Sequence, residues 1–127
     1  MARTALTVKK IDAATLNITT NDTAIDATLV TNGVDITDFF DTREGTRTLL
    51  VTNSEASAKN VTISAGPTAS AVNETGDLVV AVPASTQLSI GNLTSSKYDQ
   101  GDGSLYVDFE TGTTGFVIGL GEGRSFR

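Results

Sequence analysis

The chain has 127 residues, of which nine are Lys or Arg and fifteen are Asp or Glu, so its formal net charge is −6. It contains no histidine and no cysteine, which excludes disulfides, thiolate metal sites and the nucleophile systems that depend on either residue. The length suits one domain spanning residues 1–127, and the acidic balance argues against nucleic acid as a partner, because neutralising phosphates requires clustered basic residues.

Alternating apolar residues predict short β-strands along most of the chain. The first is residues 5–11, where Leu6 and Val8 share one face, and a second follows at residues 15–19. Further β-rich runs, each bounded by Gly, Pro, Asn or Asp, lie at residues 25–30, 47–53, 60–65, 77–82, 86–91, 104–109 and 115–120. This spacing predicts an all-β fold, either a single-domain β-sandwich or a jelly-roll-like barrel with about seven to nine short antiparallel strands.

One stretch has a mild helical pattern. In VDITDFFDTREG, residues 34–45, Ile36, Phe39 and Phe40 can form one apolar stripe, and Gly45 is a suitable stop signal. The N-terminus lacks the apolar core of a signal peptide, and no run approaches the roughly 20 apolar residues of a membrane helix, so no membrane partner is expected.

The segment KYDQGDGSLYVDF, residues 97–109, resembles a calcium-binding loop. Asp99 and Asp102 are the weak candidate ligands, but the third acid and the flanking helices of an EF-hand are missing. Asp-Gly before an alternating apolar strand is ordinary turn chemistry. We therefore interpret the segment as a turn that starts a strand, with no metal or other cofactor required.

Catalysis would have to use carboxylates, because histidine and cysteine are absent. Asp108 and Glu110 lie two residues apart on a predicted strand and therefore point to the same face. Two acids on one solvent-exposed face are far more common than a catalytic pair, and the chain has no tryptophan to hold a sugar ring. We predict that the protein is not an enzyme.

An unusually large share of the asparagines lie in the glycosylation pattern Asn-x-Ser/Thr. The five sequons begin at Asn17, Asn21, Asn60, Asn73 and Asn92. They indicate either an exposed, glycosylated protein or the preference of Asn and Thr for turns and strand ends, and the sequence does not decide between the two.

Four stretches carry a resemblance to a known family. MARTALTVKKI (1–11) resembles an opening of the form MA-x-TALT, and GTRTLLVTNSEASAKNVTISAG (45–66) resembles a strand, an Asn-containing turn and an ITVTI strand. DLVVAVPASTQLSIGNLTSSKYDQGDGSLYVDF (77–109) is similar to a run of the form VxVPAxxTxxIGP…Y…DGSVYVDY, and TGFVIGL (114–120) resembles a closing strand. The family is that of small proteins of tailed viruses, encoded beside the major capsid protein, which decorate the head.

The chain also departs from this family. Residues 20–42 have no counterpart, Asn92 replaces the expected proline after Ile90 and Gly91, and the tail GEGRSFR extends past the last strand. The resemblance implies a virion structural protein, made in the host cytoplasm and bound to the outer surface of the capsid. Its implied partners are the major capsid protein and further copies of itself, with a trimer as the expected assembly.

Such a protein acts through surfaces, and the sequence suggests where they lie. Residues 1–10 are a candidate extended segment or arm, and Phe126 is an aromatic residue between two arginines. The candidate contact residues are Arg3, Leu6, Val8 and Phe126, although Leu6 and Val8 also suit a core and the terminus also suits disorder. The alternative functions are a surface glycan- or host-binding β-sandwich and a tail or head–tail connector protein.

Overall fold

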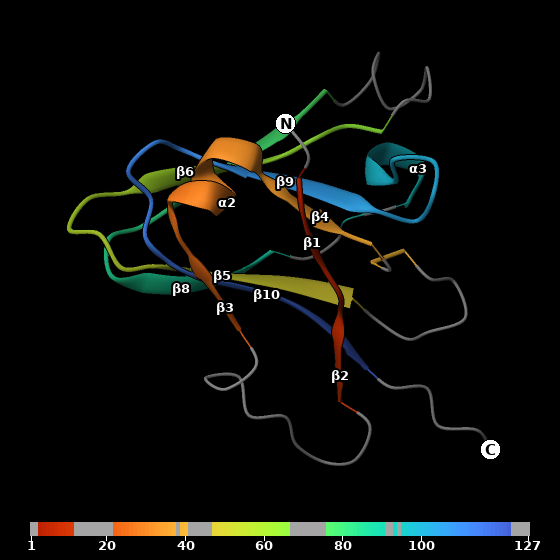
Figure 1. The fold of residues 1–127 in the computed structure, drawn as a ribbon, viewed down its shortest axis with the longest axis horizontal. Coiled ribbons are helices and arrows are strands. Elements are labelled where there is room, and N and C mark those ends of the chain that lie inside the picture. Colours follow the sequence, from red (N-terminus) through yellow and green to blue (C-terminus); the bar gives the residue numbers. More distant parts are fainter. Residues whose placement is uncertain are drawn as a thin grey trace.

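The computed structural model describes residues 3–11, 22–37, 39–40, 47–66, 76–90, 93 and 95–122. Strands predominate in this part of the chain, and Figure 1 shows them as two layers. In chain order the elements are β1 (Thr4–Leu6), β2 (Lys9–Ile11), β3 (Thr23–Ile25), α2 (Ala27–Asn32), β4 (Val34–Ile36), β5 (Arg47–Asn53), β6 (Lys59–Ile63), β7 (Leu78–Val82), β8 (Thr86–Ile90), α3 (Ser95–Tyr98), β9 (Leu105–Phe109) and β10 (Gly115–Glu122).

The two layers are two five-stranded sheets. The first has the order β1-β4-β9-β6-β7, and the second has the order β2-β10-β5-β8, with β3 also paired to β10. Both sheets stay open, so the predicted all-β sandwich is confirmed and the barrel alternative is not adopted. Most pairs are antiparallel, while β1 with β4 and β2 with β10 are parallel.

The core lies between the sheets and follows from the alternation within each strand. In β9, Leu105, Val107 and Phe109 are buried, whereas Tyr106 and Asp108 face outward. The facing strands contribute in the same way, so that the inner layer consists mainly of Val, Ile and Leu, with Phe39 fully buried among them. Burial of such side chains stabilises the domain by about 1.5–3 kcal/mol each.

The N-terminal segment is built into both sheets. Residues of β1 pair with β4 in the first sheet, those of β2 pair with β10 in the second, and Figure 1 shows this red segment running from one layer to the other. Val8 lies between the two strands and is 6% exposed. The segment suggested as an arm therefore supplies an edge strand to each layer and an apolar side chain to the core.

Six of the predicted strands are confirmed with small shifts at their ends, and they correspond to β5–β10. The run 15–19 lies outside the described residues. The predicted strand at 25–30 is wrong after Ile25, because most of this stretch belongs to helix α2. Asp26 caps the helix by accepting a hydrogen bond from the Leu29 N–H at 2.9 Å, and Gly33 ends it.

The helix expected within residues 34–45 is also wrong for the part that is described. Residues 34–36 form β4, with Val34 and Ile36 buried on one side in strand alternation. Phe39 and Phe40 follow in a turn and pack edge to face, with ring centroids 5.1 Å apart. The apolar residues that suggested a helical stripe are therefore divided between a strand and a turn.

One buried polar side chain holds the connections between the sheets. Asn53 ends β5 and is 1% exposed. Its amide nitrogen donates to the carbonyl oxygens of Ser57, Val82 and Pro83 at 2.9, 3.0 and 3.2 Å, and its Oδ1 accepts from the Glu55 N–H at 2.9 Å. A single side chain thus joins the β5–β6 loop to the end of β7.

Candidate contact surfaces

The outer face of the first sheet carries a cluster built around Arg3. The guanidinium of Arg3 lies against the Asp108 carboxylate in a bidentate pair, with Nη1–Oδ1 and Nη2–Oδ2 distances of 2.8 and 3.1 Å. It also lies 4.4 Å from the centroid of the Tyr106 ring, close enough for a cation–π contact. Paired charges and a stacked ring hold the side chain in one position, and we call these three residues the Arg3 cluster.

Gly33 makes the Arg3 cluster sterically feasible. Arg3 precedes β1, and its side chain reaches β9 across the start of β4. A Cβ atom at position 33 would overlap with both the Arg3 guanidinium and the Asp108 carboxylate. The backbone there also has φ of 78°, and its carbonyl accepts a hydrogen bond from the Thr4 N–H at 3.0 Å. Glycine is therefore required at this position for both shape and conformation.

The candidate contact residues have different environments. The Arg3 side chain is 24% exposed and engaged with Asp108, Leu6 is half-buried against the core, and Val8 belongs to the core. Phe126 lies outside the described residues. Of the three candidates within the described residues, only Arg3 lies on an outer face of the sandwich.

The carboxylate pair considered for catalysis is tied into the sheet. Asp108 binds Arg3, and Glu110 accepts the Asn60 N–H at 2.9 Å and lies 3.8 Å from the ammonium nitrogen of Lys59. These contacts give each carboxylate a structural role. The absence of enzymatic activity stays a prediction.

The segment that resembles a calcium loop forms a turn between α3 and β9. One oxygen of Asp99 accepts the N–H groups of Gly101 and Gly103 at 2.8 and 2.9 Å, and Asp102 accepts the Ser104 N–H at 3.2 Å. Among the described residues, no group of three or more acidic side chains could hold a metal ion. The two carboxylates therefore replace missing backbone hydrogen bonds in the turn.

Removing divalent cations should consequently have little effect on stability. With EDTA we expect the melting temperature to change by less than about 3 °C, because a bound ion that contributed folding free energy would raise it by mass action. The measurement is thermal unfolding by circular dichroism with EDTA and with excess calcium. A difference of about 10 °C between the two would contradict the turn interpretation.

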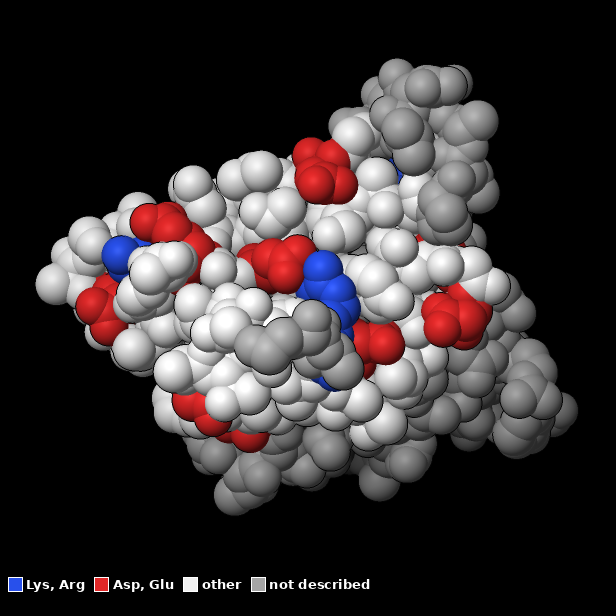
Figure 2. Space-filling model, turned by 45° about the horizontal axis from the view of Figure 1, so that its top comes forward, with Lys and Arg blue, Asp and Glu red and all other residues white. Residues whose placement is uncertain are grey.

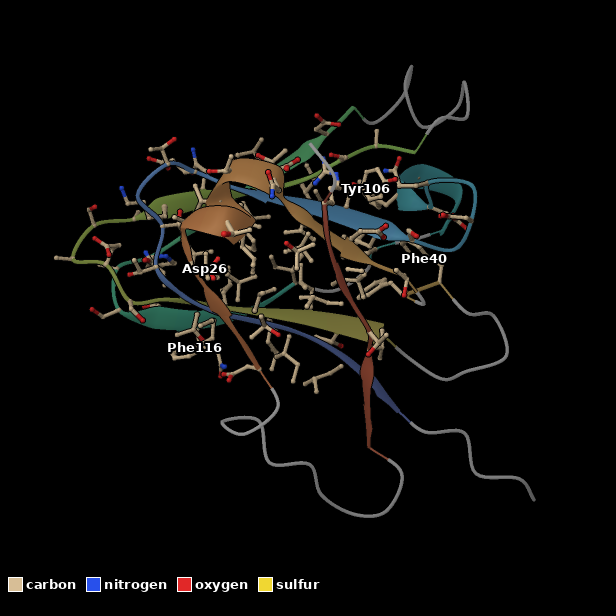
Figure 3. All side chains as sticks on the ribbon, in the orientation of Figure 1. Asp26, Phe40, Tyr106 and Phe116 are labelled. Atoms are coloured by element: carbon tan, nitrogen blue, oxygen red, sulfur yellow. The ribbon has the colours of Figure 1, made fainter. Side chains whose placement is uncertain are left out.

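Large apolar side chains are exposed on both outer faces. Phe116 on β10 is 41% exposed and Val79 on β7 is 57% exposed, the two exposed large hydrophobic residues of the described part of the chain. Figure 3 shows Phe116 and Tyr106 on opposite sides of the sandwich. Phe116 lies beside Ala24 and Thr52 of the neighbouring strands.

Sequence reasoning did not single out Phe116, although a signal was present. The run GFVIGL is apolar at nearly every position, so it cannot place all its side chains in one core. Val117 is fully buried, and strand alternation then sends its neighbour Phe116 to the opposite face. Ile118, the next residue on the outer face, is only 4% exposed, so the apolar side chain that this face leaves accessible is that of Phe116.

On the face shown in Figure 2, acidic side chains are scattered over the described surface and basic side chains are few. The basic side chain at the centre of this view lies beside acidic ones. Asn60, the one sequon asparagine within the described residues, is exposed, while the other four lie outside them.

In the described part of the chain, no helix is long and apolar enough to cross a bilayer.

Comparisons of the chain with protein-family models, with curated proteins and with solved structures find no match. By its architecture the protein is an open β-sandwich, which has ten strands in the described residues and an exposed large apolar side chain on each outer face. Its function is inferred from these surfaces and from the sequence patterns.

Proposed function

We propose that this protein is a capsid decoration protein of a tailed virus. It binds the outer surface of the assembled head and stabilises the contacts between major capsid subunits. The observation that carries the proposal is the exposed Phe116 on the outer face of the second sheet, because a large apolar side chain that is accessible on a sheet surface suits a protein contact.

The arrangement of the segments that resemble the decoration family supports the same proposal. Those segments supply β1 and β2, then β5–β9, and finally β10, which together make up most of both sheets. The unmatched residues 20–42 supply β3, α2 and β4, and β4 lies between β1 and β9. The unmatched residues therefore supply an inner strand that joins β1 to the rest of the first sheet, while the resembling segments supply the other strands of both sheets apart from β3.

Assembly explains how so small a domain gains sufficient affinity. A stable protein interface buries on the order of 1,200–2,000 Å² in total, which is a large area for one sheet face. Contacts spread over two neighbouring capsid subunits and over further copies of the protein meet this requirement, and each contact raises the effective concentration for the next. Binding should therefore depend on the assembled shell, with copies of the protein arranged symmetrically on it as trimers.

The test compares assembled shells with free capsid subunits. We expect the protein to co-sediment with expanded shells, and to bind unassembled capsid protein at least about tenfold more weakly in gel filtration, because the shell alone presents adjoining subunits. Equal binding to both, or no binding to shells, would contradict the decoration proposal. It would favour the tail-connector or glycan-binding alternatives.

Two matched substitutions locate the contact. Phe116→Asp should reduce shell binding at least about tenfold, since burying an unpaired carboxylate in an interface is costly. Val79→Asp makes the same change at a more exposed apolar residue on the other sheet and should leave shell binding within about twofold. Loss of binding in Val79→Asp alone would place the contact on the first sheet instead.

A further inference from the structure

A hollow opens at one end of the sandwich, where β3 leads into α2. Its volume is about 360 Å³, within the range of about 300–1,000 Å³ that is typical of ligand pockets. One wall is formed by Ile25 and by Asp26, Ala27, Val30 and Thr31 at the start and along one side of α2. The other wall is the β9–β10 turn, residues 111–114.

The walls of this hollow are largely apolar. Ile25 is 4% exposed, and Val30 is half-buried against the core. The threonine hydroxyls of the turn already have partners, since Thr113 Oγ1 donates to the Glu110 carbonyl at 2.6 Å and Thr114 Oγ1 donates to Glu55 at 2.5 Å. The hollow therefore suits a compact apolar side chain, such as an aromatic ring.

Negative charge surrounds the hollow. Asp26 lines it, and Glu55 contacts its wall through Thr114. Within the described residues, neither carboxylate forms an ion pair, whereas the nearby Glu110 is offset by Lys59, 3.8 Å away. The complementary occupant is thus an apolar side chain with positive charges next to it.

The chain itself contains such a segment. In the tail GEGRSFR, residues 121–127, Phe126 has Arg124 on one side and Arg127 on the other. We propose that this tail binds in the hollow of a second copy of the protein, with the Phe126 ring between the two walls and the arginines near Asp26 and Glu55.

Because β10 is long, the tail can bind only in the hollow of another copy of the protein. β10 runs from Gly115, next to the turn that lines the hollow, to Glu122, and a strand of eight residues extends about 23 Å. From Glu122 to Phe126 the backbone spans at most about 14 Å even when fully extended. The tail therefore cannot reach its own hollow, whereas a neighbouring molecule can present one close to it.

This contact is head-to-tail, because the tail and the hollow are different surfaces at opposite ends of one strand. Such contacts form a closed ring when the rotation between copies allows it, and an open chain otherwise. The inference goes beyond the proposed function, since tail and hollow can associate in solution without a capsid shell.

The direct test measures binding of a fluorescein-labelled GEGRSFR peptide to the full-length Phe126→Ser protein by fluorescence anisotropy. We expect saturable binding that weakens several-fold when NaCl rises from about 50 to 500 mM, because the arginine contacts are screened. Thr31→Arg, an exposed wall position, should weaken binding at least about tenfold through bulk and like charge. Thr37→Arg makes the same change at an exposed threonine beyond β4 and should alter binding less than about twofold.

A complementation experiment distinguishes this contact from any other mode of association. Sedimentation analysis of the wild type should show concentration-dependent association, while Thr31→Arg and Phe126→Ser alone should each remain monomeric. Their equimolar mixture should form dimers and nothing larger, because only the Thr31→Arg tail and the Phe126→Ser hollow are both intact. Peptide binding that Thr31→Arg and Thr37→Arg weaken equally, no peptide binding at about 1 mM protein, or a mixture that stays monomeric would overturn the proposal.

Discussion

Asn53→Ala should lower the free energy of unfolding by about 3 kcal/mol, among the largest effects of any single polar substitution in this domain. The side chain is 1% exposed and makes four hydrogen bonds, three of them to carbonyl oxygens. Alanine would leave those carbonyls and the Glu55 N–H without this partner, and each buried unsatisfied group costs about 1–3 kcal/mol unless water reaches it.

The measurement is urea unfolding followed by circular dichroism, and the matched control is Asn60→Ala. Asn60 is exposed, and its backbone rather than its side chain makes the hydrogen bonds to Glu110, so this change should stay within about 0.5 kcal/mol. In thermal melts Asn53→Ala should lose about 10 °C. Equal stabilities for the two variants would show that Asn53 does not hold the β5–β6 loop to β7.

The central strands could be predicted because their signal is local. In β9 the alternation of Leu105, Val107 and Phe109 with more polar neighbours predicts which face of the strand is buried, and the structure confirms this prediction. The failure at residues 25–36 has an equally physical cause. IDATLV is rich in residues that favour strands. However, Asp26 caps the N-terminus of α2 and Gly33 ends this helix, so a short helix forms where propensity alone favours a strand.

The surfaces were harder to predict because their contacts are distant in the sequence. Arg3 and Asp108 are 105 residues apart, and no local pattern indicates that they meet. Asn53 is a mixed case, because Glu55 and Ser57 are its close neighbours in the sequence whereas Val82 is 29 residues away. Phe116 differs from these cases, because a strand that is apolar on both faces is visible in the sequence.

Gly33→Ala should destabilise the domain by about 3 kcal/mol. Two effects combine at this position. The backbone has φ of 78° and ψ of 179°, a conformation that only glycine adopts without strain, and a Cβ would overlap with Arg3 and Asp108. Gly76→Ala is the matched control, because Gly76 has φ of 61° but no atom within 4 Å of an added Cβ, so its cost should be about 1 kcal/mol from strain alone.

A double-mutant cycle separates the two effects at Gly33. Arg3→Ala alone should cost about 1 kcal/mol, since the ion pair with Asp108 is partly exposed. In the Arg3→Ala background, the cost of Gly33→Ala should fall by about 1 kcal/mol, because one of the two overlapping side chains is gone while the backbone strain and the Asp108 contact remain. Additive costs, or a Gly33→Ala cost equal to that of Gly76→Ala, would mean that the Arg3 cluster does not pack on Gly33. A positive coupling would show that the Arg3 side chain packs on Gly33 and helps to hold the N-terminal segment on the first sheet.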